Sequence, residues 1–183
     1  MDRAALSAAL AAYVPDGDAE SASLTRLRAF VAGPEDPFYR ATPEGHVTGS
    51  AVVARPDGSA FLLVLHRKLS RWLQPGGHTE EADASVFDTA LREAREETGL
   101  SQLSVVRKLG EIIYDISPYR YEIQHRHVFQ LQVHEPTGQR WPSQELHDGH
   151  QPPTRLECFW IPLRNAHILQ AGQGALIGAI IDE

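Results

Sequence analysis

The feature that most constrains this 183-residue chain is a group of three glutamates crowded onto one turn of a predicted helix. The helical pattern covers about residues 84–98, and Gly99 is placed to end it in the left-handed conformation. Glu93 and Glu97 are four residues apart, so their carboxylates share one helix face, with Glu96 to the side. Because like charges at this spacing repel each other, the segment needs a compensating partner.

Two kinds of partner fit these glutamates. Arg92 and Arg95 would neutralise them as surface ion pairs. The alternative is a hard divalent cation, because Mg²⁺ prefers oxygen ligands and commonly takes carboxylates together with substrate phosphates. The preceding Gly76-Gly77 favours the cation, since two glycines permit a tight turn that aims a backbone carbonyl at the same ion.

This segment resembles the Nudix box, G-x5-E-x7-R-E-U-x-E-E-x-G-U with U apolar, and the run Arg92-Glu93-x-x-Glu96-Glu97-x-Gly99 matches it directly. Before the box, residues 65–78 are similar to a little-characterised bacterial Nudix group with an HxK…WLQPGGH stretch. After it, residues 157–160 resemble the late E-x-x-W strand of many Nudix domains. The resemblance covers about residues 47–160.

The chain departs from the family pattern at the start of the helix. Counting five residues from Gly77 leads to Asp83, where the family usually has Glu, and eight residues rather than seven then precede Arg92. We expect the shorter Asp83 to cap the helix, because Asp is a preferred N-cap residue. The glutamates lie beyond the insertion and keep their spacing.

Strands mixed with one central helix predict an α/β or α+β sandwich. The predicted strands cover residues 46–55, 61–67, 105–115, 125–134 and 156–161, and the turn Pro56–Ser59 joins the first two. Residues 68–77 and 143–154 are expected to be loops, and residues 165–181 a broken helix. The resemblance implies an α/β fold, a Nudix-type α/β/α sandwich with a mixed β-sheet. This domain would span residues 46–183, after an N-terminal helical extension over residues 1–45.

The resemblance also implies the metal site. Glu93 and Glu97 would be the main Mg²⁺ ligands, with Glu96 sharing a second ion and Mn²⁺ as a substitute. The backbone carbonyl of Gly76 would complete the first site. Arg92 would hold the glutamates in orientation.

A general base must orient the attacking water. In the family this role falls to a box glutamate, here Glu97 or Glu96, or to an acid on a distant loop, here Glu145 or Asp148. An exposed acidic loop is the simpler interpretation of the latter pair. The substrate phosphates would be contacted by three residues that flank the box: His66, Lys68 and His78.

Several other side chains have simpler interpretations. Strand alternation points His125 and His127 inward, and we interpret His127 as a core histidine rather than a phosphate or metal contact. Trp72 and Tyr119 are interpreted as packing rather than base-stacking residues. Cys158 is interpreted as a buried strand residue, not a nucleophile.

Composition limits the function further. The formal net charge of −7 argues against a groove that binds a nucleic-acid backbone through positive charge. We therefore expect a small nucleotide-type substrate. No 18-residue apolar stretch or signal peptide is present, which predicts a cytoplasmic protein without membrane attachment. The first 45 residues are expected to cover the core or to mediate homodimerisation.

The function that follows from the resemblance is Mg²⁺-dependent hydrolysis of a pyrophosphate bond in a nucleoside diphosphate linked to another moiety. A catalytically silent Nudix-like ligand-binding module is the first alternative, motivated by the spacing at Asp83. An isomerase similar to isopentenyl diphosphate isomerase is the second, although no Cys precedes the box here. Pro118 and Tyr119 resemble substrate markers of different Nudix enzymes, so the substrate stays open.

Overall fold

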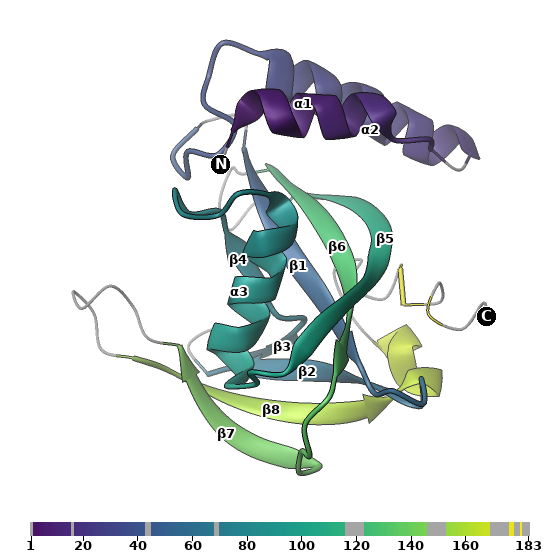
Figure 1. The fold of residues 1–183 in the computed structure, drawn as a ribbon, viewed down its shortest axis with the longest axis vertical. Coiled ribbons are helices and arrows are strands. Elements are labelled where there is room, and N and C mark those ends of the chain that lie inside the picture. Colours follow the sequence, from purple (N-terminus) through teal and green to yellow (C-terminus); the bar gives the residue numbers. More distant parts are fainter. Residues whose placement is uncertain are drawn as a thin grey trace.

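The computed structural model is built on a sheet that mixes parallel and antiparallel strands (Figure 1). The structure describes residues 2–15, 17–42, 45–67, 70–115, 123–145, 153–168, 176–177 and 180. The strands are β1 His46–Ala54, β2 Ala60–His66, β3 Arg71–Leu73, β4 Gly76–His78, β5 Leu103–Asp115, β6 Ile123–Val133, β7 Arg140–Glu145 and β8 Thr154–Pro162.

The strand order is β5-β6-β1-β2-β8-β7, with β3 added to β2 and β4 added to β1. β1 pairs with β6 in parallel, and the other pairs are antiparallel. Between β1 and β2 the predicted turn is confirmed, because the Asp57 carboxylate accepts hydrogen bonds from the amide and hydroxyl of Ser59. The predicted α/β architecture is therefore confirmed.

Helix α3, Val86–Thr98, lies across one face of the sheet, which bends around it (Figure 1). Its C-terminal cap is Gly99, as predicted, with a φ of 73° and an amide that donates to the Arg95 carbonyl at 2.8 Å. The predicted N-cap is wrong. The helix begins at residue 86, so Ser85 is the cap and its hydroxyl accepts from the Asp88 amide at 3.2 Å.

Gly49 of β1 lets α3 approach the sheet closely. A Cβ atom at this position would lie 2.6 Å from the Val86 carbonyl oxygen and 2.7 Å from the Ala90 amide nitrogen. Both are backbone atoms of α3, so they cannot move aside without shifting the helix. The position of the glutamate-bearing helix therefore depends on a residue without a side chain at this point of β1.

Each face of the sheet covers an apolar core. Ala51 and Val53 of β1 point toward α3, in a core that also contains Phe129 and Trp160. Val52 points to the opposite face. There it packs with residues of β2, β6, β8 and the 3-10 helix η1, Leu163–Ile168: Phe61, Leu63, Val128, Ile161, Leu163 and Ala166.

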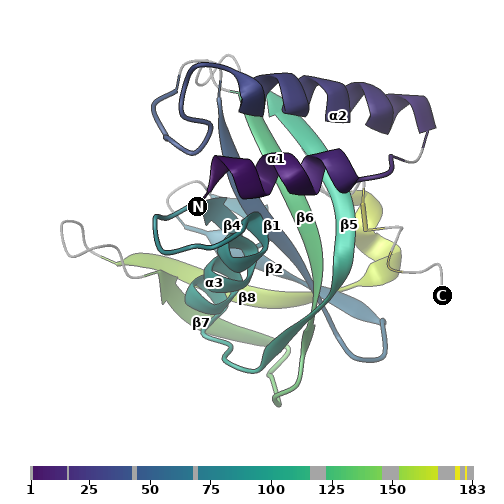
Figure 2. The same ribbon diagram turned by 45° about the horizontal axis from the view of Figure 1, so that its top comes forward.

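The N-terminal helices are present as an antiparallel pair, α1 Arg3–Ala12 and α2 Gly17–Ala32, which lies over one end of the sheet (Figure 2). Arg28 of α2 donates to the Leu10 carbonyl at the end of α1, at 2.6 Å from Nη2. Arg3 of α1 donates to the Gly33 carbonyl beyond the end of α2, at 2.7 Å. Each helix thus supplies a cation that caps the other's C-terminus.

The helical pair packs onto the rest of the chain through a shared apolar cluster. Its buried members from the pair are Leu6, Leu10, Leu24, Leu27 and Val31. Val47 of β1 is buried in the same cluster, and Val86 at the start of α3 packs against the cluster. The domain boundary after residue 45 stays a prediction.

Two regions that were predicted as loops contain strand residues. Residues 68–77, expected as a loop, contain β3 and the start of β4, and the stretch from residue 143 begins inside β7. Such short strands carry too little alternation to be recognised. Of the broken helix predicted over residues 165–181, residues 165–168 lie in the 3-10 helix η1, and most of the remainder lies outside the described residues. Among the helices that the structure describes, none combines the length and apolarity of a membrane span.

Gly49→Ala tests the close approach of α3. Because the added methyl meets backbone rather than a flexible side chain, we expect a loss of about 1–3 kcal/mol in the free energy of unfolding, as for overpacked cores. Urea denaturation measures it. Gly138→Ala is the milder control, since the atom nearest to its added Cβ, the Arg140 carbonyl oxygen, would lie 3.3 Å away rather than 2.6 Å. Equal stability of the Gly49 variant and the wild type would contradict the steric argument.

Candidate active site

Glu93 and Glu97 project from α3 toward β4 and are buried, with exposed fractions of 7% and 9%. The Glu97 carboxylate accepts a hydrogen bond from the Gly76 amide at 3.2 Å. The Glu93 carboxylate lies directly against Gly77, where a Cβ atom would come within 2.5 Å of its Oε1. The paired glycines therefore form the wall against which both carboxylates rest.

Burial leaves these two carboxylates poorly solvated. It raises the pKa of Glu93 to about 7, with Glu96 and Glu145 adding to the rise and Arg92 opposing it. Burial also raises the pKa of Glu97 well above its ordinary value, and the Glu93 charge adds to this, whereas the Gly76 hydrogen bond opposes it. The pair is thus a local excess of negative charge that a cation would relieve.

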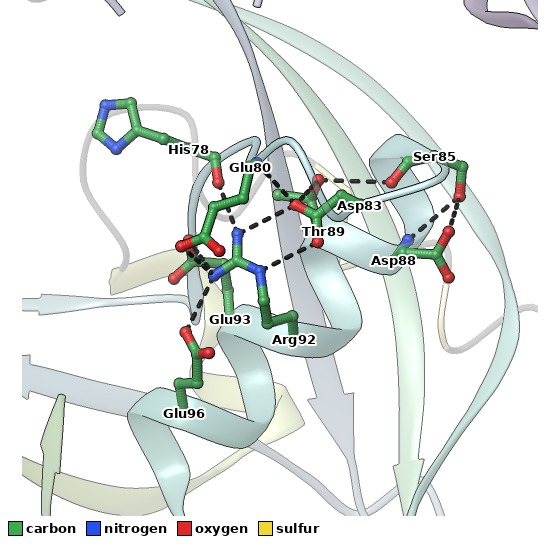
Figure 3. Close-up of polar contacts among 9 residues, drawn as sticks. All are labelled: His78, Glu80, Asp83, Ser85, Asp88, Thr89, Arg92, Glu93 and Glu96. Carbon is green, nitrogen blue, oxygen red and sulfur yellow. Dashed lines mark hydrogen bonds and ion pairs between the residues drawn. The ribbon is translucent and has the colours of Figure 1, made fainter. Parts of the chain in front are cut away.

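Arg92 lies at the centre of a polar network on the outer side of this pair (Figure 3). Its Nε and Nη2 atoms each lie 3.1 Å from the Asp83 carboxylate, and Nη2 also donates to the His78 carbonyl at 2.8 Å. Its Nη1 atom contacts three carboxylates: Glu96 at 2.9 Å, Glu93 at 3.3 Å and Glu80 at 3.4 Å. Burial alone would lower the Arg92 pKa, but the hydrogen bonds to Asp83 and these acidic neighbours raise it.

Asp83 anchors Arg92 instead of capping the helix. Its carboxylate accepts from the Glu80 amide at 2.9 Å and from the Thr89 hydroxyl at 2.8 Å, besides the two bonds from Arg92. Burial alone would raise the Asp83 pKa, but these hydrogen bonds hold it below its ordinary value.

Glu96 points away from the buried pair. Its side chain is 46% exposed and forms the i,i+4 ion pair with Arg92. Within the described part of the chain, no group of three or more His, Cys, Asp or Glu side chains is arranged to hold a metal ion. The structure thus brings two of the three predicted glutamates together at Gly76 and Gly77.

The remaining predicted residues are placed as follows. His66 ends β2, whereas Lys68 and Asp148 lie outside the described residues. His78 is in β4, and its ring stacks on His46 with a centroid separation of 4.8 Å. Glu145 ends β7 close enough to raise the pKa of both Glu93 and Glu97.

The simpler interpretations hold for the described side chains. His127 is buried, with Nδ1 3.2 Å from the buried Glu111 carboxylate. Trp72 packs on Phe159 with a centroid separation of 5.4 Å. Burial raises the pKa of the Cys158 thiol to about 12, which does not suit a nucleophile. The side chain of His125 and all of Pro118 and Tyr119 lie outside the described part.

The sequence reasoning missed Glu80 and Thr89, which support the Asp83–Arg92 pair. Thr89 precedes Arg92 by three residues, so helical spacing alone puts both on one face. Glu80 carries no such signal, because its position depends on the turn before the helix.

Asp83→Asn tests the anchor through the pH dependence of stability. Because the folded-state pKa is lowered, the Asp83 charge stabilises the fold above the unfolded pKa of about 3.9, and this is lost as the pH falls through the folded pKa. We expect the variant to lose about 1–3 kcal/mol at pH 7 and progressively less as the pH falls below about 4, measured by urea denaturation. The exposed Asp18→Asn is the control. A pH-independent loss would contradict the charge-based account.

Comparisons with known proteins identify a domain family and support the fold. A model of the NUDIX domain matches residues 45–177. An Ap4A hydrolase from C. elegans is 20% identical, with 72% of this chain and 92% of that chain covered and a TM-score of 0.53. The E. coli dihydroneopterin triphosphate pyrophosphohydrolase is 18% identical, with coverage of 78% and 97% and a TM-score of 0.55.

The NUDIX domain of Shewanella oneidensis NrtR, in complex with ADP ribose, is 21% identical, with coverage of 79% and 90% and a TM-score of 0.53. A comparison with curated protein sequences gives no match. The solved structures support the fold, and the domain match covers most of the chain. The chain therefore belongs to the Nudix family.

Proposed function

We propose that this chain hydrolyses the pyrophosphate bond of a small nucleotide-type substrate with Mg²⁺ held by Glu93 and Glu97. The observation that carries the proposal is the burial of these two carboxylates against Gly76 and Gly77. A buried pair of like charges is costly to a fold, so its presence beside a glycine wall supports a functional role.

The residues present fit a hard divalent cation, which Nudix hydrolases generally use. Mg²⁺ is usually held by one or two carboxylates together with substrate phosphates, and two buried carboxylates converge here. Gly77 matters to this fit, because a side chain in its place would occupy the position of the Glu93 carboxylate. The Gly76 carbonyl as a further ligand, and Glu96 at a second ion, belong to the same proposal.

When bound, the cation would neutralise phosphate oxygens and lower the pKa of the attacking water. The protein's own residues have separate tasks. Arg92 holds Glu93 and Glu96 through Nη1 while Asp83 fixes its other nitrogens, so it orients the carboxylates. Its positive charge also offsets part of their repulsion.

For the general base we favour Glu145 over the box glutamates. The box glutamates lie on α3, whereas Glu145 ends β7 and acts electrostatically on both Glu93 and Glu97. An acid on the opposite wall is suited to orient a water that attacks between the two elements. Glu97, Glu96 and Asp148 are the alternatives.

The substrate class follows from what the similar structures share. Their proteins act on or bind Ap4A, dihydroneopterin triphosphate and ADP ribose, each of which contains a phosphoanhydride. We extend this class to the present chain, with His66, Lys68 and His78 as phosphate contacts. A cytoplasmic location and a homodimer complete the proposal.

Glu97→Gln tests the catalytic assignment. Wild type and variant are compared on ADP-ribose, a nucleotide sugar, a dinucleoside polyphosphate and a nucleoside triphosphate, with and without Mg²⁺. We expect at least about a hundredfold loss of kcat/KM on the best substrate, as for loss of a catalytic carboxylate. Glu35→Gln, in an exposed loop, is the control and keeps full activity. Equal rates in wild type and the Glu97 variant would refute the assignment, and ligand binding without metal or turnover would favour the silent module.

Thermal unfolding with and without Mg²⁺ tests the metal site independently of turnover. We expect Mg²⁺ to raise the Tm of the wild type, because a ligand that binds only the folded state stabilises it. In EDTA at pH 8, Glu97→Gln should be more stable than the wild type, since it removes one of two buried like charges. Mg²⁺ should raise its Tm much less. An equal Mg²⁺ effect in both proteins would place the cation elsewhere.

A further inference from the structure

Trp141 of β7 is hydrogen-bonded to the end of the catalytic helix. Its indole Nε1 donates to the Thr98 carbonyl at 2.9 Å. Thr98 is the last residue of α3, so its carbonyl has no acceptor role inside the helix. The Cys158 thiol is also directed at this end. Its sulfur lies 3.8 Å from the Glu97 carbonyl oxygen and 3.9 Å from the Thr98 carbonyl oxygen, and a thiol is a weak donor.

The face of β7 that carries Trp141 lies along the site. Trp141, Ser143 and Glu145 alternate with more exposed residues along the strand, so all three face α3. Trp141 contacts Thr98, and the Ser143 hydroxyl would lie 3.8 Å from a Cβ atom at Gly99. At the end of this row, Glu145 acts electrostatically on Glu93 and Glu97.

We propose that Trp141 is a positioning residue for catalysis, whose indole hydrogen bond fixes the separation between the strand that carries Glu145 and the helix that carries Glu97. This inference rests on the proposed function, because it assigns the reaction to groups on these two elements. Thr98 directly follows Glu97 and Trp141 precedes Glu145 by four residues on the same face of β7, so the bond joins the two elements that carry these groups. Small displacements of reacting groups lower rates steeply.

The chain offers a matched control in Trp160 of β8. Its ring lies 6.2 Å from that of Trp141, and its indole donates to the Thr137 hydroxyl, also at 2.9 Å. Trp160 is completely buried, whereas Trp141 is partly exposed. Both substitutions by Phe remove one indole hydrogen bond, but only the one at Trp141 reaches α3.

The test compares Trp141→Phe and Trp160→Phe in kcat and KM on the best substrate of the panel and in urea stability. We expect Trp141→Phe to lower kcat about 10- to 100-fold with KM changed less than about threefold. Trp160→Phe should lose at least as much stability but keep kcat within about twofold of the wild type. If loss of kcat followed loss of stability in both variants, the role of Trp141 would be structural and the proposal overturned.

A double-mutant cycle with Glu145 distinguishes a positioning role from a general loss of stability. Trp141→Phe is introduced into Glu145→Gln, and the two losses of kcat should be less than multiplicative, because both act on the placement of one group. Fully multiplicative losses would overturn the proposal. Failure of the proposed function is distinguishable, because Glu97→Gln would then remain active. A dead Glu97 variant beside an unimpaired Trp141→Phe would overturn only the positioning role.

Discussion

The structure depends on the close approach of α3 to two strands that carry glycine at the points of contact. Gly49 admits the backbone of the first turns of the helix, and Gly77 admits the Glu93 carboxylate. Gly49 and Gly77 are opposed in the β1–β4 ladder, so the two contacts lie side by side. A side chain at Gly49 would push the helix away from the sheet, and a side chain at Gly77 would displace the Glu93 carboxylate.

The charges of the site are arranged unevenly around the helix. On the outer side, Arg92 donates two hydrogen bonds to Asp83, and its Nη1 atom contacts three glutamates. On the inner side, Glu93 and Glu97 face β4 with raised pKa values and only partial compensation. This contrast is typical of functional sites, where a fold keeps an arrangement that stability alone would not favour.

The elements that could be predicted from the sequence are those specified by residues close together in the chain. The glutamate spacing, the helix and its end at Gly99 were all predictable, because 3.6-residue periodicity and the glycine requirement of the left-handed cap are local properties. The burial of His127 followed from strand alternation in the same way. The N-terminal helices were predictable as helices. The hydrogen bonds that Arg3 and Arg28 donate to the C-terminal end of the other helix were not, because they depend on how the two helices pack.

The failures share a different cause. Ser85, not Asp83, caps the helix. The Asp83 carboxylate instead accepts a hydrogen bond from the Arg92 side chain, a contact that no local sequence pattern predicts. The short strands β3 and β4 are fixed by their neighbours rather than by their own residues.

The central claim is that two buried carboxylates beside a glycine wall hold a divalent cation. Anomalous diffraction from crystals soaked in Mn²⁺ tests it most directly. The account predicts one strong peak within bonding distance of both Glu93 and Glu97 that disappears in crystals of Glu97→Gln. A peak that lies elsewhere, or that persists unchanged in the variant, would contradict it.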